Sequence, residues 1–122
     1  MKLIIQGRPA SKKNNRKLVP RGKAIMSFPS QAYQRFEEDA LGQLLQQKPQ
    51  GGWKSEGFFD AIYTFYQKGK LIQDADNAMA SINDVLEKAG VIENDKNIIS
   101  GGFMIIRGSL EWKTELEITH IT

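Results

Sequence analysis

Residues 74–95 read DADNAMASINDVLEKAGVIEND, and this stretch carries the strongest structural signal in the chain. After Asn77, apolar residues recur at helical spacing, at Met79, Ile82, Val85, Leu86 and Ala89. Gly90 follows at the point where a left-handed residue would end a helix. The stretch therefore predicts the end of a strand, an N-cap, a helix and a stop, followed by a polar turn at residues 93–97.

Three carboxylates flank this predicted helix. Asp74 and Asp76 precede it, and an Asp-x-Asp pair in extended backbone puts both side chains on one face, because side-chain direction alternates along a strand. Asp95 follows the helix and would reach the pair only if the chain folds back under the helix start. With no Cys and one His in the chain, such oxygen ligands favour Mg²⁺ or Mn²⁺ over Zn²⁺.

A simpler interpretation of the same residues is helix capping. Asp and Asn before an apolar helix are common N-caps, and carboxylates there interact favourably with the helix dipole. One cap accounts for one residue, however, and leaves the other carboxylates unexplained. Both interpretations therefore stay open at this point.

The length of 122 residues fits one compact domain, which we expect to span residues 1–122. No apolar run approaches the ~20 residues needed to cross a bilayer, and the apolar start of the chain is too short for a signal peptide. We therefore expect a soluble, cytoplasmic protein. The absence of Cys excludes disulfides.

The charge of +3 is unevenly distributed along the chain. The first 30 residues carry eight Lys or Arg and no acidic residue, whereas the rest carries nine basic and fourteen acidic residues. A basic segment beside a carboxylate cluster suits a protein that binds nucleic acid through one surface and a metal through another. The candidate DNA-binding residues are Lys12, Lys13, Asn14, Asn15, Arg16, Lys17, Lys68 and Lys70. A flexible, solvated tail is the alternative for the N-terminal part of this set.

The remaining elements follow from periodicity and turn signals. Residues 3–5 and 24–28 predict short strands around an exposed basic loop that includes residues 11–17. Residues 58–66 predict a central strand, and residues 98–107 and 115–121 predict closing strands joined by a turn at residues 108–109, with Leu116, Ile118 and His120 on one face. Ser30 is the expected N-cap of a first helix with an apolar stripe at Tyr33, Phe36, Ala40, Leu41, Leu44 and Leu45. The fold class is therefore α+β.

One set of residues matches a known family pattern. It consists of Pro9, Asn14-Asn15-Arg16, a basic stretch, Lys70, Asp74-Ala75-Asp76-Asn77 and Leu86-x-Lys88-Ala89-Gly90-Val91-Ile92-x-Asn94-Asp95. In these residues the chain resembles the RusA family of Holliday junction resolvases over nearly its whole length. The resemblance implies a mixed β-sheet with two main helices packed on it, and a homodimer that cuts four-way DNA junctions in recombination and repair. It also implies that Asp74, Asp76 and Asp95 are catalytic, Mg²⁺-binding carboxylates.

Ala80 is the main departure from the family pattern, which commonly has a Lys at this position. A cation there would neutralise charge developing on the phosphate, and Lys70, Lys96 or Arg16 are the candidates to replace it. Two alternatives to a nuclease follow. One is a junction-binding protein of the same fold without turnover. The other is a small Mg²⁺-dependent phosphohydrolase acting on nucleotides, although a mononucleotide has too few phosphates to use six spread cations.

Overall fold

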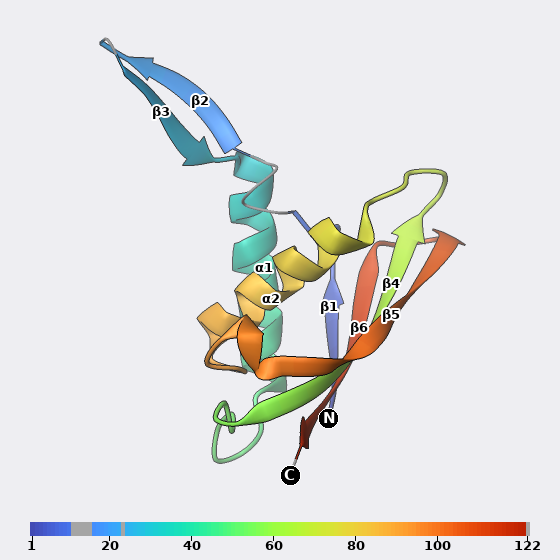
Figure 1. The fold of residues 1–122 in the computed structure, drawn as a ribbon. Helices are drawn as coiled ribbons and strands as arrows, with labels where there is room; N and C mark the ends of the chain where they lie inside the picture. The colour runs from blue at the N-terminus through green and yellow to red at the C-terminus, as the bar shows by residue number, and fades with distance from the viewer. Residues whose placement is uncertain (11–15, 23, 122) are drawn as a thin grey trace.

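The computed structural model describes residues 1–10, 16–22 and 24–121, which form one α+β domain (Figure 1). Its body is a four-stranded sheet with two helices, and a two-stranded hairpin extends from it. In chain order the elements are β1 (Lys2–Gln6), β2 (Arg16–Arg21), β3 (Ala24–Pro29), α1 (Gln31–Gln47), β4 (Phe58–Lys68), α2 (Ala75–Ala89), the 3₁₀ turn η1 (Asp95–Asn97), β5 (Ile98–Ser109) and β6 (Lys113–Ile121).

The sheet is mixed, with the strand order β1-β6-β4-β5. Strand β6 runs antiparallel to both β1 and β4, while β5 runs parallel to β4. Strand β4 is central, as predicted. Its side chains alternate between buried and more exposed positions, and the buried ones are Phe59, Ala61, Tyr63, Phe65 and Gln67. On β6, Leu116 and Ile118 are buried on the same face, which confirms the predicted alternation.

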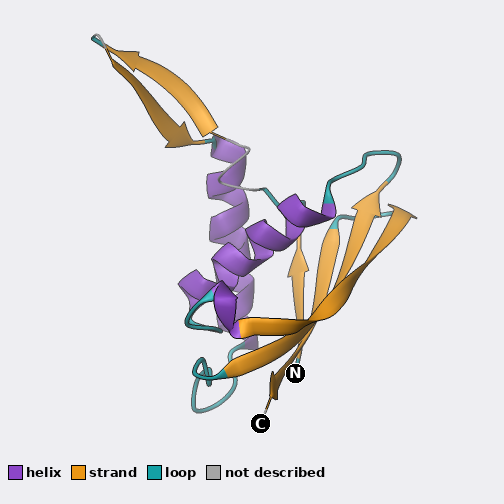
Figure 2. Ribbon diagram, viewed as in Figure 1, coloured by secondary structure: helices purple, strands orange, loops and turns teal. Residues whose placement is uncertain are grey.

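Both helices cover one face of the sheet (Figure 2). Helix α1 begins after the predicted N-cap Ser30, whose Oγ accepts the Tyr33 N–H at 3.2 Å. It buries Tyr33, Phe36, Ala40 and Leu44. Leu45, predicted in the same stripe, is 69% exposed. The prediction is wrong there because Leu45 lies 100° around the helix from Leu44, on the side away from the sheet.

Helix α2 confirms the predicted apolar face and stop. Ile82, Val85 and Leu86 are fully buried, and Gly90 ends the helix in the left-handed region at φ 79°. The expectation of an extended Asp-x-Asp pair is wrong. Asp74 has extended backbone as the N-cap, but the helix already begins at Ala75, so Asp76 lies in its first turn.

Two strand predictions also need correction. Strand β2 was not expected, because its sequence has few apolar residues and its partner is β3 alone rather than the core. The turn between β5 and β6 falls at residues 110–112 instead of 108–109, and β4 separates the two strands in the sheet. At Gly101 a Cβ would lie 1.8 Å from the Ala61 carbonyl oxygen, so the close approach of β5 to β4 requires glycine there.

The two edges of the sheet differ. At β1, the side-chain amides of Gln43 and Gln47 from α1 bond to the backbone as an extra strand would. Gln47 accepts from the Ile4 N–H at 2.8 Å and donates to the Ile4 carbonyl at 2.7 Å, and Gln43 does the same at Gln6 at 2.6 and 3.1 Å. Within the described part of the chain, nothing comparable covers the outer edge of β5.

The β2–β3 hairpin lies beyond the N-terminal end of α1 and away from the four-stranded sheet (Figure 1). It therefore projects a basic part of the sequence outward from the domain. No helix among the described residues is long and apolar enough to cross a membrane.

Candidate functional site

Asp74 and Asp76 lie together at the N-terminus of α2. The Asp74 Oδ1 accepts the Asp76 N–H at 2.9 Å, and the Asp74 carbonyl accepts the Ala78 N–H at 3.0 Å. The capping interpretation of Asp74 is thus confirmed, and it uses one of the two carboxylate oxygens. The other oxygen and the whole Asp76 carboxylate remain available, since both residues are exposed.

Asp95 begins the 3₁₀ turn η1 and is also exposed. Its backbone N–H donates to Glu87 Oε1 at 2.5 Å, which fixes the turn to the last part of α2. The side chain of Asn94 caps the turn by accepting the Lys96 N–H at 2.9 Å. Asp95 is therefore held in a defined backbone conformation while its carboxylate faces solvent.

Within one chain, the pair and Asp95 are not brought together. Asp76 lies in the first turn of α2, and Asp95 is attached at Glu87, eleven residues further along the helix, a length of about 16 Å at 1.5 Å per residue. In the described ranges, no group of three His, Cys, Asp or Glu residues is close enough to hold a metal ion. Among these same residues, none of Asp74, Asp76 and Asp95 forms an ion pair with Lys or Arg.

One face of α2, polar except at Ala80, runs between these carboxylates. Asp76, Ala80, Asn83 and Glu87 follow each other at spacings of three or four residues and so share this face. The Tyr63 hydroxyl, from β4, donates to Asn83 Oδ1 at 2.6 Å. Burial raises the pKa of Tyr63 to about 12, and the negative charge of Asp95 adds to the increase. Tyr63 therefore stays protonated at neutral pH.

Sequence reasoning missed Asn83 and Glu87 as neighbours of the candidate site. Their helical spacing from Asp76 was visible in the sequence and could have indicated them. Their partners could not be read from the sequence, because Tyr63 belongs to another element and the Glu87 contact depends on how the chain leaves α2.

The predicted basic residues occupy two places. Lys68 ends β4 and Lys70 lies in the turn after it, both exposed, a few residues before Asp74. Arg16 and Lys17 belong to β2, whereas we expected an exposed loop. The predictions at Lys12, Lys13, Asn14 and Asn15 lie outside the described residues.

The two residues that precede the basic segment lie beside the start of α2. The Ser81 hydroxyl, which is buried, donates to the Ala10 carbonyl at 2.9 Å, and the Gln73 amide donates to the Pro9 carbonyl at 2.5 Å. Residues 9 and 10 are thus attached to the helix that carries Asp76. The cationic segment follows immediately in the sequence.

The residues present fit a divalent cation that keeps several water ligands. Mg²⁺ is commonly held by one or two carboxylates together with waters and substrate phosphates, and the exposed pair at α2 offers such a set. A third carboxylate would have to come from elsewhere.

No family model and no curated protein matches this chain. The family resemblance therefore stays a prediction from the residues that carry it.

Proposed function

We propose that this protein is a Mg²⁺-dependent, structure-selective endodeoxyribonuclease that resolves four-way DNA junctions, as its resemblance to the RusA family implies. In this proposal Asp74, Asp76 and Asp95 are the metal-binding carboxylates, with Mn²⁺ as an alternative ion. The basic residues from Lys12 to Lys17, with Lys68 and Lys70, bind the DNA backbone. The proposed location is the cytoplasm.

The observation that carries the proposal is the attachment of residues 9 and 10, which directly precede the basic segment in the sequence, to the start of the helix that carries Asp76. Ser81 and Gln73 hold residues 9 and 10 against the N-terminal half of α2. DNA bound by the segment that follows would therefore run past Asp74 and Asp76. Cations that position the phosphates and carboxylates that hold a metal are the two parts that phosphodiester hydrolysis requires.

The roles of the chain's own residues follow from their positions. Asp76 is the more available metal ligand, because Asp74 also caps the helix. When bound, a divalent cation supplies an activated water and stabilises negative charge on the phosphate and the leaving oxygen. Lys68 and Lys70 lie on the approach to this pair, where they would hold a phosphate next to it.

The homodimer in this proposal would form through β5. Residues 98–106 carry no charge, and Ile99, Phe103 and Met104 are 57, 52 and 61% exposed on this unpaired edge. A long apolar edge strand is a template for strand pairing. Asp95 precedes this stretch and Arg107 follows it, so antiparallel pairing of two copies would set each acidic end beside the partner's basic end.

This pairing would also complete the carboxylate set. The side-chain amide of Gln67, on β4, donates to the carbonyl of Gln73, just before α2, at 2.9 Å. The neighbouring residue Tyr66 pairs with Ile106 on β5. The start of α2 therefore lies level with the end of β5. A two-fold, antiparallel β5 pair would bring the start of the partner's β5, and with it the partner's Asp95, to this level. In the plane of the sheet, the start of α2 and the partner's Asp95 would then be about two strand spacings, or about 10 Å, apart.

The substitution Asp76→Asn tests the metal-binding role. It removes charge with little change in shape, so we expect cleavage of a synthetic four-way junction with Mg²⁺ to fall by on the order of 10² to 10³. Junction affinity should stay equal or increase, because repulsion of phosphate is reduced. Single-turnover cleavage and fluorescence anisotropy of labelled junction measure the two quantities.

Asp39→Asn is the matched control, since Asp39 is an exposed carboxylate on α1, and it should cleave at the wild-type rate. Wild-type cleavage by Asp76→Asn would refute the metal assignment. Binding of junctions by the wild-type protein without cleavage in Mg²⁺ or Mn²⁺ would instead favour the non-catalytic junction-binding protein.

A further inference from the structure

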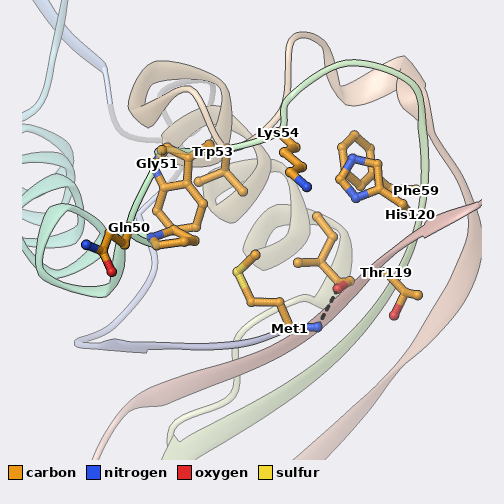
Figure 3. A pocket seen from close by; sticks show the side chains of 12 residues that line it. Met1, Gln50, Gly51, Trp53, Lys54, Phe59, Thr119 and His120 are labelled. Atoms are coloured by element: carbon orange, nitrogen blue, oxygen red, sulfur yellow. Dashed lines mark hydrogen bonds between the residues drawn. The ribbon is translucent and has the colours of Figure 1, made fainter.

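A pocket of about 470 Å³ lies at the end of the sheet where β4 begins and β6 ends (Figure 3). Its volume is in the range of pockets that hold small organic groups. Trp53 forms one side, and Phe59 with His120 forms the opposite side, while Val91 and Ile118 also line it. The walls are thus mainly aromatic and aliphatic.

The aromatic walls are held in place by the fold. Trp53 is half-buried and packs against the hydrophobic core. His120 lies over Phe59 with their ring centroids 4.4 Å apart and an interplanar angle of 48°. The loop that carries Trp53 is anchored as well, since the Ser55 carbonyl accepts the Glu93 N–H at 3.2 Å.

Lys54 supplies a positive charge between these walls. Its side chain points into the space between Trp53 and His120 (Figure 3). Among the described residues it forms no ion pair with a carboxylate. A second hollow of about 460 Å³ shares Trp53, Lys54 and His120 with the pocket and adds Ser55 and Glu56. The pocket therefore continues past Lys54 as a groove.

The Met1 ammonium also lines the pocket, but it is paired with Glu117 and the Ile118 carbonyl. Flat aromatic walls, the Lys54 cation and a continuing groove match one unit of a nucleic acid strand. Bases stack on aromatic rings whatever their sequence, and an ammonium group pairs with phosphate. A base inside a duplex cannot enter such a pocket, because its faces are already stacked on its neighbours. The ligand class is therefore an unpaired nucleotide.

The position of the pocket agrees with this ligand. Phe59 pairs with His120 on one side and with Ile98 on the other, and Ile98 directly follows the turn that contains Asp95. His120 and Ile98 are thus about two strand spacings, or about 10 Å, apart, and Asp95 lies three residues before Ile98.

We propose that the pocket between Trp53 and His120 binds an unpaired nucleotide of the DNA, with the base stacked on the rings and its phosphate on Lys54. This inference rests on the proposed function, because the base pairs beside the strand exchange of an open four-way junction are stacked on one side only, and a base there can be unpaired at the lowest cost. The pocket would hold such a base while the adjacent phosphodiester reaches the carboxylates.

Trp53 fluorescence reports directly on the pocket. The chain has two Trp residues, so Trp112→Phe leaves Trp53 as the only one. In this protein, single-stranded oligothymidylate and a four-way junction should quench Trp53 emission, whereas a blunt duplex should not. Lys54→Ala should weaken the affinity for oligothymidylate by roughly tenfold, and His120→Ala by roughly fivefold or more.

Lys48→Ala is the control for Lys54→Ala, because Lys48 is an exposed lysine on the same connection that does not line the pocket. It should leave quenching unchanged. Circular dichroism of each variant shows whether the fold is kept. Trp53→Phe retains an aromatic ring, so its affinity for labelled oligothymidylate, measured by anisotropy, should equal that of the wild type.

The outcomes separate the pocket from the proposed function. If labelled junction binds but Trp53 emission does not change, the pocket proposal is overturned and the nuclease proposal stands. Equal quenching by duplex would also overturn the unpaired nucleotide as ligand. If oligothymidylate quenches Trp53 in a protein that neither binds nor cuts junctions, the pocket proposal stands and the nuclease proposal falls.

Discussion

At the scale of single residues, Ala80 is the position that we expect to limit the rate of cleavage at the proposed site. It is exposed on α2, four residues after Asp76 and on the same face of the helix. A cation at this position would lie where negative charge develops on the phosphate. The absence of a Lys there leaves this task to Lys70 or Lys96, which are exposed near the two carboxylate positions, or to Arg16.

We predict that Ala80→Lys raises the single-turnover rate of junction cleavage by about tenfold or more. Junction affinity should change little, because the added charge acts mainly in the transition state. Gln46→Lys, which adds the same charge to an exposed position of α1, should not change the rate. If Ala80→Lys is no faster while Lys70→Ala or Lys96→Ala is much slower, the cation of the site lies elsewhere.

Residue-level features of α2 could be predicted because they are local. The cap before the helix, the apolar spacing within it and Gly90 at its end all depend on neighbours within a few residues, and the structure confirms them. The extended Asp-x-Asp pair was wrong for the same local reason. Asp74 is a sufficient N-cap, so the helix begins at Ala75, earlier than predicted, and includes Asp76.

At the scale of elements, the β2–β3 hairpin is the part of the fold that the sequence indicated least. Its two strands pair only with each other, so β2 lacks the alternation of a half-buried strand. The position of Asp95 was likewise not predictable, because it depends on α2 staying helical for 15 residues before the chain turns. The covering of the β1 edge by the side chains of Gln43 and Gln47 was also not predictable, because the bonded residues are about forty positions apart in the sequence.

The hairpin and the segment before it carry the proposed salt-dependent binding. Exchange of Lys12, Lys13, Arg16 and Lys17 for Ala removes up to four phosphate contacts, each contributing about 0.9 to the slope of log affinity against log salt concentration. We predict that the slope for a four-way junction decreases by up to roughly 3.6. Anisotropy titrations between low and moderate salt measure it.

Lys48→Ala, at the opposite end of α1 from the hairpin, should leave this slope unchanged. A quadruple variant with the wild-type slope would show that these four residues do not contact the DNA backbone.

At the scale of the whole molecule, one copy of the domain keeps the proposed metal ligands Asp76 and Asp95 apart along α2, and its described residues leave the apolar edge at β5 uncovered. The proposed two-fold dimer would explain both features with a single arrangement. It would place two equivalent sites around a symmetry axis, as two symmetric cuts of a four-way junction would require.

A mixed dimer of Asp76→Asn and Asp95→Asn subunits tests this arrangement and the nuclease function together. If each site takes Asp76 from one subunit and Asp95 from the other, the mixed dimer has one site with both substitutions and one intact site. The two subunits, co-expressed with different affinity tags, can be isolated as the mixed dimer and assayed with Mg²⁺ on a four-way junction. The account predicts that each parent homodimer is inactive and that the mixed dimer nicks one strand at about half the wild-type rate. A mixed dimer that is as inactive as its parents, beside a wild-type protein that cuts, would contradict the shared site, and a wild-type protein that never cuts would contradict the nuclease itself.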